Sequence, residues 1–111
     1  MDALVQPGAL RLSTSRHNGV VTVTVAGELD IATTGQLRAV AEDALRGGAR
    51  QLTLEMTEVS FIAADGLGVL VALATQARRQ DTRLVLGKVS PAVARLLEIT
   101  SLDRHFTMEP S

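Results

Sequence analysis

The chain contains no cysteine, tryptophan or tyrosine, and its two phenylalanines are Phe61 and Phe106. Without cysteine it has neither a disulfide nor a thiolate metal site, which is typical of a cytoplasmic protein. With so few aromatic rings it also lacks the stacking surfaces that bind bases or sugars. The core must therefore be built from valine, leucine, isoleucine and alanine.

Long hydrophobic runs and an excess of one charge are also missing. The most apolar stretch, Leu67 to Ala74, is far shorter than the ~20 residues that a membrane span requires. The first ten residues show no signal-peptide pattern. Eleven basic and 12 acidic residues give a formal charge of −1, which offers no electrostatic footprint for nucleic acid or an anionic membrane. We expect a cytoplasmic protein with no nucleic-acid partner and no direct membrane insertion.

The chain has 111 residues, enough for one modest hydrophobic core and too few for a second. We therefore expect a single domain over residues 10–108, a flexible N-terminus over residues 1–9 and a short tail over residues 109–111.

Strand and helix patterns alternate from residue 20 onward. Val21, Val23 and Val25 alternate with threonines at the two-residue period of a half-buried strand. Asn18-Gly19 predicts a hairpin turn, and Ser90-Pro91 predicts the start of a helix. The predicted strands are 10–15, 20–25, 52–56, 83–86 and 105–108, and the predicted helices are 33–46, 66–79 and one that begins at Ser90-Pro91.

Each later pair of predicted strands is separated by a crossover long enough to be helical, which implies parallel pairing with right-handed connections. The fold class predicted is α/β: a small domain with a mostly parallel sheet of four or five strands, an N-terminal antiparallel hairpin and three or more helices.

One segment stands where a strand should pass into a helix: Phe61-Ile62-Ala63-Ala64-Asp65-Gly66-Leu67-Gly68. In open α/β sheets ligands and modifications gather at such junctions, because free N–H groups and the helix dipole favour negative charge there. The two glycines permit close approach of a partner backbone. The segment itself carries no hydroxyl group.

Four segments, in this order, resemble the anti-sigma factor antagonists of the STAS family (sulfate transporter and anti-sigma factor antagonist). They are Gly27-Glu28-Leu29-Asp30, Val59-Ser60-Phe61-Ile62, Gly66-Leu67-Gly68-Val69-Leu70 and Ser90-Pro91-Ala92-Val93. The resemblance covers the chain from about residue 10 to residue 108. Family members carry a switch of the form Asp-Ser-Ser/Thr-Gly-Leu-Gly, and here Ala63, Ala64 and Asp65 stand at its first three positions.

The resemblance implies a regulatory protein without enzymatic activity or a cofactor. Its partner would be an anti-sigma factor, a serine kinase with a histidine-kinase-type ATP-binding fold, and binding would release a sigma factor. In the family, phosphorylation of the serine at the position of Ala64 abolishes binding, because it adds about −1.5 to −2 charges to a docking surface. A methyl group accepts no phosphate, so the hypothesis is an antagonist that cannot be switched at this site. The partner-binding positions implied are Asp30, Ala63, Ala64, Asp65, Gly66 and Leu67.

Two carboxylates in this set have alternative interpretations. Asp65 either imitates phosphorylation in part or serves as a helix N-cap that accepts an N–H bond. Asp30 either contacts the partner or stabilises the turn before the first helix.

Other functions have less support in the residues. A Mg²⁺ site like that of an aspartyl-phosphate receiver would draw its carboxylates from Glu28, Asp30, Glu55, Glu58 and Asp65. Such a receiver also needs a lysine near the phosphoryl group, and the one lysine in the sequence is Lys88. Solvated strand ends explain these acids equally well, so no metal is expected. The alternative to antagonism is a STAS adaptor subunit of a transport or stressosome-like complex, which clamps a partner without switching. A sensor that binds a small ligand is a third class of function.

Overall fold

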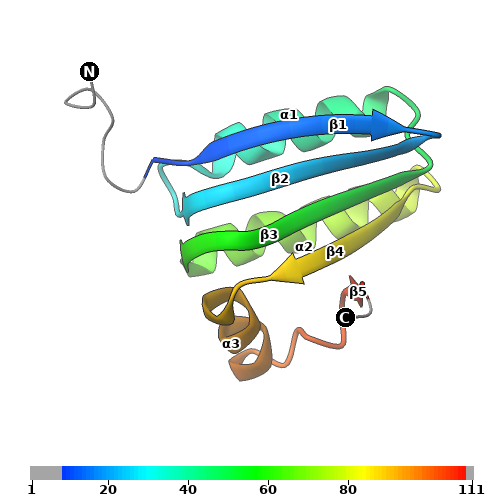
Figure 1. Cartoon of the computed structure of the whole chain (residues 1–111). Coiled ribbons are helices and arrows are strands. Elements are labelled where there is room, and N and C mark those ends of the chain that lie inside the picture. The colour runs from blue at the N-terminus through cyan, green and yellow to red at the C-terminus, as the bar shows by residue number, and fades with distance from the viewer. Residues whose placement is uncertain (1–8, 110–111) are drawn as a thin grey trace, which may run out of the picture.

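A computed structural model describes residues 9–109 and contains one sheet of five strands in the order β1-β2-β3-β4-β5 (Figure 1). Strand β1 (Arg11–His17) pairs antiparallel with β2 (Val20–Leu29). Strands β3 (Gln51–Ile62), β4 (Arg83–Val89) and β5 (Thr107–Met108) follow in parallel. The predicted α/β fold, with its hairpin and mostly parallel sheet, is confirmed.

Three helices connect the parallel strands: α1 (Thr34–Arg46), α2 (Ala64–Arg79) and α3 (Pro91–Ile99). Each joins neighbouring strands, and right-handed crossovers that advance in one direction place their helices on the same face of a sheet. Helices α1 and α2 accordingly lie together behind the sheet in Figure 1. They leave the opposite face of the central strands without a helix among residues 9–109.

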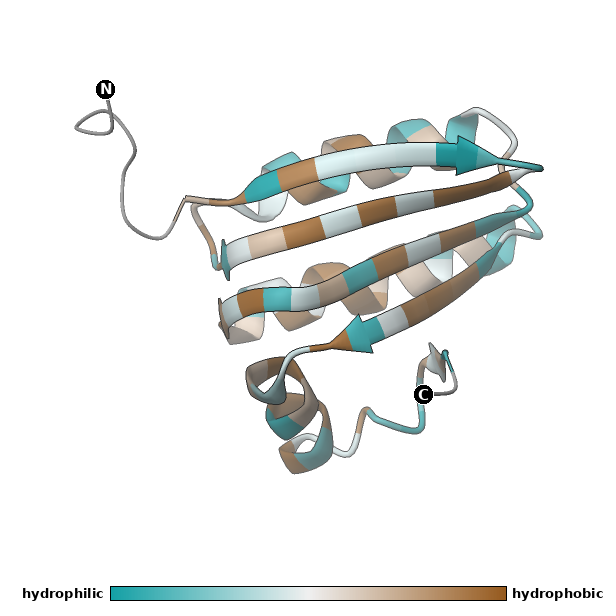
Figure 2. Ribbon diagram, viewed as in Figure 1, coloured by the Kyte–Doolittle hydropathy of each residue, from teal (hydrophilic) through white to brown (hydrophobic). Residues whose placement is uncertain are grey.

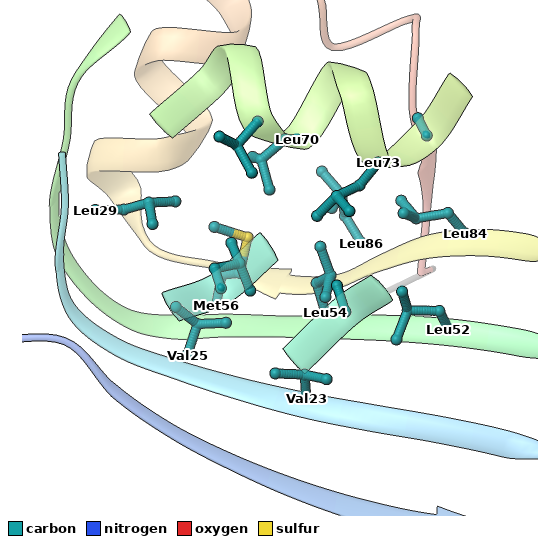
Figure 3. Packing of buried hydrophobic residues seen from close by; sticks show 14 of the residues in the cluster. Val23, Val25, Leu29, Leu52, Leu54, Met56, Leu70, Leu73, Leu84 and Leu86 are labelled. Carbon is teal, nitrogen blue, oxygen red and sulfur yellow. The ribbon is translucent and has the colours of Figure 1, made fainter. Parts of the chain in front are cut away.

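The core lies between the sheet and these helices. Leu52, Leu54 and Met56 of β3 are fully buried and lie below Leu70 and Leu73 of α2 (Figure 3). Burying each such side chain contributes roughly 1.5–3 kcal/mol. The alternation that the valines and leucines predict is visible as alternating bands along β2 and β3 (Figure 2).

Two turn and capping predictions are confirmed. Asn18 and Gly19 have φ of 51° and 79°, the positive values that a primed hairpin turn requires. The Ser90 hydroxyl accepts the N–H of Val93 at 3.3 Å, and Pro91 is the first residue of α3. Local chemistry therefore sets these two boundaries.

Strands β2 and β3 are longer than their sequence patterns predict. The pairing between them shifts register twice, and β3 shifts once more against β4. Beyond Met56 the buried residues of β3 are Val59 and Ile62, at intervals of three. Because each shift breaks the two-residue period, these strand ends resemble loops in the sequence, and the predicted strand ends at residues 25 and 56 were wrong.

Glu55 holds the irregular stretch of β3 beside β4. Its carboxylate accepts the Thr57 N–H at 3.1 Å, the Thr57 hydroxyl, and the Lys88 N–H at 3.4 Å. Desolvation favours the neutral acid, but these hydrogen bonds and the Lys88 charge outweigh it and lower the pKa of Glu55 below its ordinary value of 4.5. The side chain thus ties two register-shifted strands together.

Two further boundaries differ from the predictions. Helix α2 begins at Ala64, two residues before the predicted start. Glu109 was expected in a loose tail, but its N–H donates to the Leu86 carbonyl at 2.8 Å. The remaining predicted loose ends, 1–8 and 110–111, lie outside the described residues.

Candidate functional site at the strand ends

The predicted junction between β3 and α2 is much tighter than an eight-residue loop. Strand β3 runs through Ile62 and α2 starts at Ala64, so Ala63 alone makes the connection. The Ala63 N–H donates to the carbonyl oxygen of Leu29 at 3.0 Å. This bond fastens the start of α2 to the end of β2, and it brings the Asp30 turn beside the junction.

Helix α2 begins without a side-chain cap. Ala63 has the extended backbone of an N-cap residue, with φ −94° and ψ 170°, and its methyl group accepts no hydrogen bond. The Leu67 N–H donates to the Ala63 carbonyl at 3.1 Å and closes the first turn. Ala64 and Asp65, the first two helical residues, are both exposed. The sequence predicted Ala64 in the segment before the helix, and the structure makes it the exposed first residue of α2.

The proposal that Asp65 is the N-cap was wrong, because Asp65 already has a position inside the first turn. Within residues 9–109 its side chain makes no hydrogen bond that would cap the helix. A carboxylate in the first turn is still favourable, since it faces the positive end of the helix dipole. Asp65 thus adds one negative charge beside Ala64.

Gly66 allows close approach, but to the chain's own β2. A Cβ atom built on Gly66 would lie 2.7 Å from the Leu29 carbonyl oxygen and 2.9 Å from the Leu29 Cγ. Gly68, by contrast, has no such neighbour within 4 Å. Gly66 is buried and Leu67 is 6% exposed. Both residues therefore lie beneath the exposed residues at the start of α2.

Asp30 stabilises the turn between β2 and α1. One carboxylate oxygen accepts the Ala32 N–H at 3.0 Å, and the backbone N–H of Asp30 donates to the Thr33 hydroxyl at 2.9 Å. Thr33 is 8% exposed, and its hydroxyl donates in turn to the Glu28 carbonyl at 2.8 Å. The turn-stabilising role of Asp30 is therefore present, and its half-buried carboxylate still reaches the surface.

Two exposed apolar residues flank this junction, and sequence reasoning assigned neither a role. Ile31, next to Asp30, is 78% exposed, and Phe61, at the end of β3, is 49% exposed. Phe61 pairs with Glu28 of β2, so both residues lie at the same edge of the sheet. The hydrophobic periodicity of the strands and helices contains no signal for an exposed apolar side chain, because such periodicity reports only buried faces.

We call the exposed and half-exposed residues of this edge the strand-end surface: Asp30, Ile31, Phe61, Ala63, Ala64 and Asp65. It combines two large apolar side chains, two methyl groups and two carboxylates. Protein interfaces commonly combine apolar anchors with a polar rim in this way.

The carboxylates considered for Mg²⁺ do not gather into a site. Within residues 9–109 there is no group of three histidine, cysteine, aspartate or glutamate side chains that could hold a metal ion. Over the same residues, no helix is long and apolar enough to cross a membrane.

Comparison with known proteins connects this geometry to a family. The family model described as "STAS domain" matches residues 11–111. The anti-sigma-B factor antagonist of Staphylococcus aureus (strain NCTC 8325 / PS 47) is 31% identical over 93 residues, which are 84% of this chain and 86% of that protein. The crystal structure of an anti-sigma factor antagonist from Mycobacterium paratuberculosis has a TM-score of 0.85 at 25% identity, over 97% of this chain and 92% of that one.

A third relative has been solved in two states. The anti-sigma factor antagonist SpoIIAA in its unphosphorylated form has a TM-score of 0.74 at 22% identity, over 93% of this chain and 90% of that one. The phosphorylated form of the Bacillus protein has a TM-score of 0.69 at 20% identity, with 93% of both chains covered. Both structures share the fold of this chain.

Proposed function

The chain belongs to the STAS domain family, and from this premise we propose that it is a non-enzymatic regulatory protein that binds an anti-sigma factor and thereby releases a sigma factor. The partner in this proposal is a kinase with a histidine-kinase-type ATP-binding fold. The names of the relatives support the first part, since both the S. aureus and the M. paratuberculosis proteins are anti-sigma factor antagonists.

The single observation that carries the proposal is the strand-end surface, which joins exposed Ala64 to the exposed apolar side chains of Ile31 and Phe61. Large apolar residues surrounded by polar ones are the usual anchors of a protein contact. Asp30, Ala63 and Asp65 complete the contact in this proposal, and the buried Gly66 and Leu67 hold it in shape. Docking on a rigid helix start needs little ordering of the chain.

Ala64 gives the proposed antagonist its second property. A hydroxyl at this position would be exposed on the first turn of α2, where a kinase can reach it, and the phosphate would add about −1.5 to −2 charges to the contact. The Ala64 methyl group removes that route. Asp65 adds one charge, but successive helical residues differ by ~100° in direction, so its carboxylate points away from the direction of the Ala64 side chain.

The first prediction tests the surface itself. Ile31→Asp should weaken binding to an ATP-binding anti-sigma factor of the same cell by about tenfold or more, because a charge would be desolvated where an apolar anchor now docks. The matched control is Ile99→Asp, since Ile99 is 66% exposed on α3 and lies outside the surface. Isothermal titration calorimetry of wild type and both variants measures the difference.

If the anti-sigma factor binds Ile31→Asp as tightly as wild type, Ile31 and the strand-end surface are not part of the contact. If wild type binds no such anti-sigma factor, the antagonist proposal fails. The adaptor alternative, in which the domain clamps a subunit of a transport or stressosome-like complex, would then be the one to pursue.

A further inference from the structure

A polar pocket lies at the opposite end of α2 from the strand-end surface. Its volume is about 260 Å³, and it is lined by the last turns of α2, the start of β4 and the segment that leads into β5. Ala64 and Arg78 are 14 positions apart in α2, about 21 Å at 1.5 Å per residue. The pocket therefore lies away from the proposed partner contact.

Three basic side chains line this pocket: Arg78 from α2, Arg83 from the first residue of β4, and His105. The other lining residues are alanine, leucine, phenylalanine and threonine, so no carboxylate is among them. The nearby acids in sequence, Asp81 and Asp103, do not line it. Within residues 9–109 the ion pairs are Arg38–Glu42 and Arg46–Asp43, which leaves the pocket arginines without a carboxylate partner.

The walls of the pocket are held in place by neighbouring contacts. The Thr82 hydroxyl donates to the Ala49 carbonyl at 2.9 Å, and the Thr82 N–H donates to the Ala77 carbonyl at 2.9 Å. The His105 ring stands edge-on to Phe106, with ring centroids 5.1 Å apart and planes at 84°. The basic groups thus come from three segments that the fold fixes against one another.

Guanidinium groups bind phosphate oxygens with paired, charge-assisted hydrogen bonds. The size of the pocket is below the roughly 300–1,000 Å³ of sites for drug-sized ligands, so it suits a small anion better than a whole nucleotide. We propose that Arg78, Arg83 and His105 form a binding site for a phosphate-class oxyanion, either free phosphate or the phosphoryl group of a small ester.

The test is an NMR titration of the ¹⁵N-labelled chain with inorganic phosphate, and in a separate arm with O-phosphoserine, against sodium chloride at matched ionic strength. We expect saturable shifts of the amide signals of Arg78, Arg83 and His105 with phosphate but not with chloride. Tighter binding of O-phosphoserine than of phosphate would identify the ester as the better ligand, and the reverse would identify the free ion.

Arg78→Gln and Arg83→Gln should each raise the dissociation constant about tenfold or more, the usual loss when a hydrogen bond between charged groups is removed. The matched control is Arg95→Gln, because Arg95 is exposed on α3, away from the pocket. Shifts that do not saturate, or an equal loss in Arg95→Gln, would overturn the proposal. Neither result bears on the anti-sigma factor contact.

Discussion

Two glycines of α2 lie two positions apart and have opposite surroundings. A side chain at Gly66 would meet the backbone and side chain of Leu29, at 2.7 and 2.9 Å from its Cβ, whereas a side chain at Gly68 would meet open space. Crowding of a packed contact costs about 1–3 kcal/mol. An exposed glycine inside a helix costs about 1 kcal/mol relative to alanine.

These surroundings predict opposite effects of the same substitution. Gly66→Ala should lower the free energy of unfolding by about 1–3 kcal/mol, while Gly68→Ala should raise it by about 0.5–1 kcal/mol. Urea denaturation followed by circular dichroism measures both. Effects of the same sign would show that Gly66 does not set the distance between α2 and β2.

At the residue scale, the sequence predicted the place of the strand-to-helix junction better than the roles of its residues. Ala64 was expected in the segment before the helix, but it is the exposed first residue of α2, because the helix begins two residues earlier than the apolar pattern predicts. The N-cap interpretation of Asp65 was wrong, and Gly66 lies against the chain's own β2, since each depends on where the helix begins to within one residue. Ile31 and Phe61 could not be found, because exposure follows from tertiary packing that no local pattern records.

At the scale of the element, the start of α2 lacks the capping acceptor that many helices use. Ala63 has N-cap geometry, and the resemblance to the family's switch places an aspartate at its position. A carboxylate there would accept N–H groups of the first turn and would face the positive end of the dipole. The helix start is therefore uncapped because residue 63 has a methyl side chain, and not because its backbone lacks N-cap geometry.

Ala63→Asp should therefore stabilise the protein by about 0.5–2 kcal/mol at neutral pH. The control is Ala39→Asp, an exposed position within α1 where no N-cap forms and where aspartate lowers helix propensity by up to about 0.7 kcal/mol. Thermal and urea unfolding compare the three proteins. A destabilised Ala63→Asp variant would contradict the proposed capping geometry.

The elements were predictable where the periodicity was regular. The alternation of Val21, Val23 and Val25 marks β2, and Leu52 with Leu54 marks β3. The outer halves of both strands were missed because register shifts and Gly27, with φ 105°, interrupt the two-residue period there. Since the strand-end surface lies on those irregular ends, its shape depends on the part of the sheet that sequence patterns describe least well.

At the scale of the whole molecule, the one-sided arrangement of the helices sets where the strand-end surface forms. Crossovers in one direction bring the starts of α1 and α2 together at the carboxyl ends of β2 and β3, where the strand-end surface forms (Figure 1). The basic pocket lies at the other end of α2. The two proposed sites share no residue.

We propose that the chain is an antagonist that a kinase cannot release by phosphorylation at position 64. The affinity for the anti-sigma factor, measured with and without ATP in wild type and in Ala64→Ser, tests this proposal. We expect ATP to leave the dissociation constant of the wild-type complex unchanged. In Ala64→Ser, the anti-sigma kinase should transfer the γ-phosphoryl group of ATP to the serine, with ADP as the leaving group, and binding should weaken by tenfold or more, because charge enters the contact. A wild-type complex that ATP dissociates as readily as that of Ala64→Ser would contradict the claim.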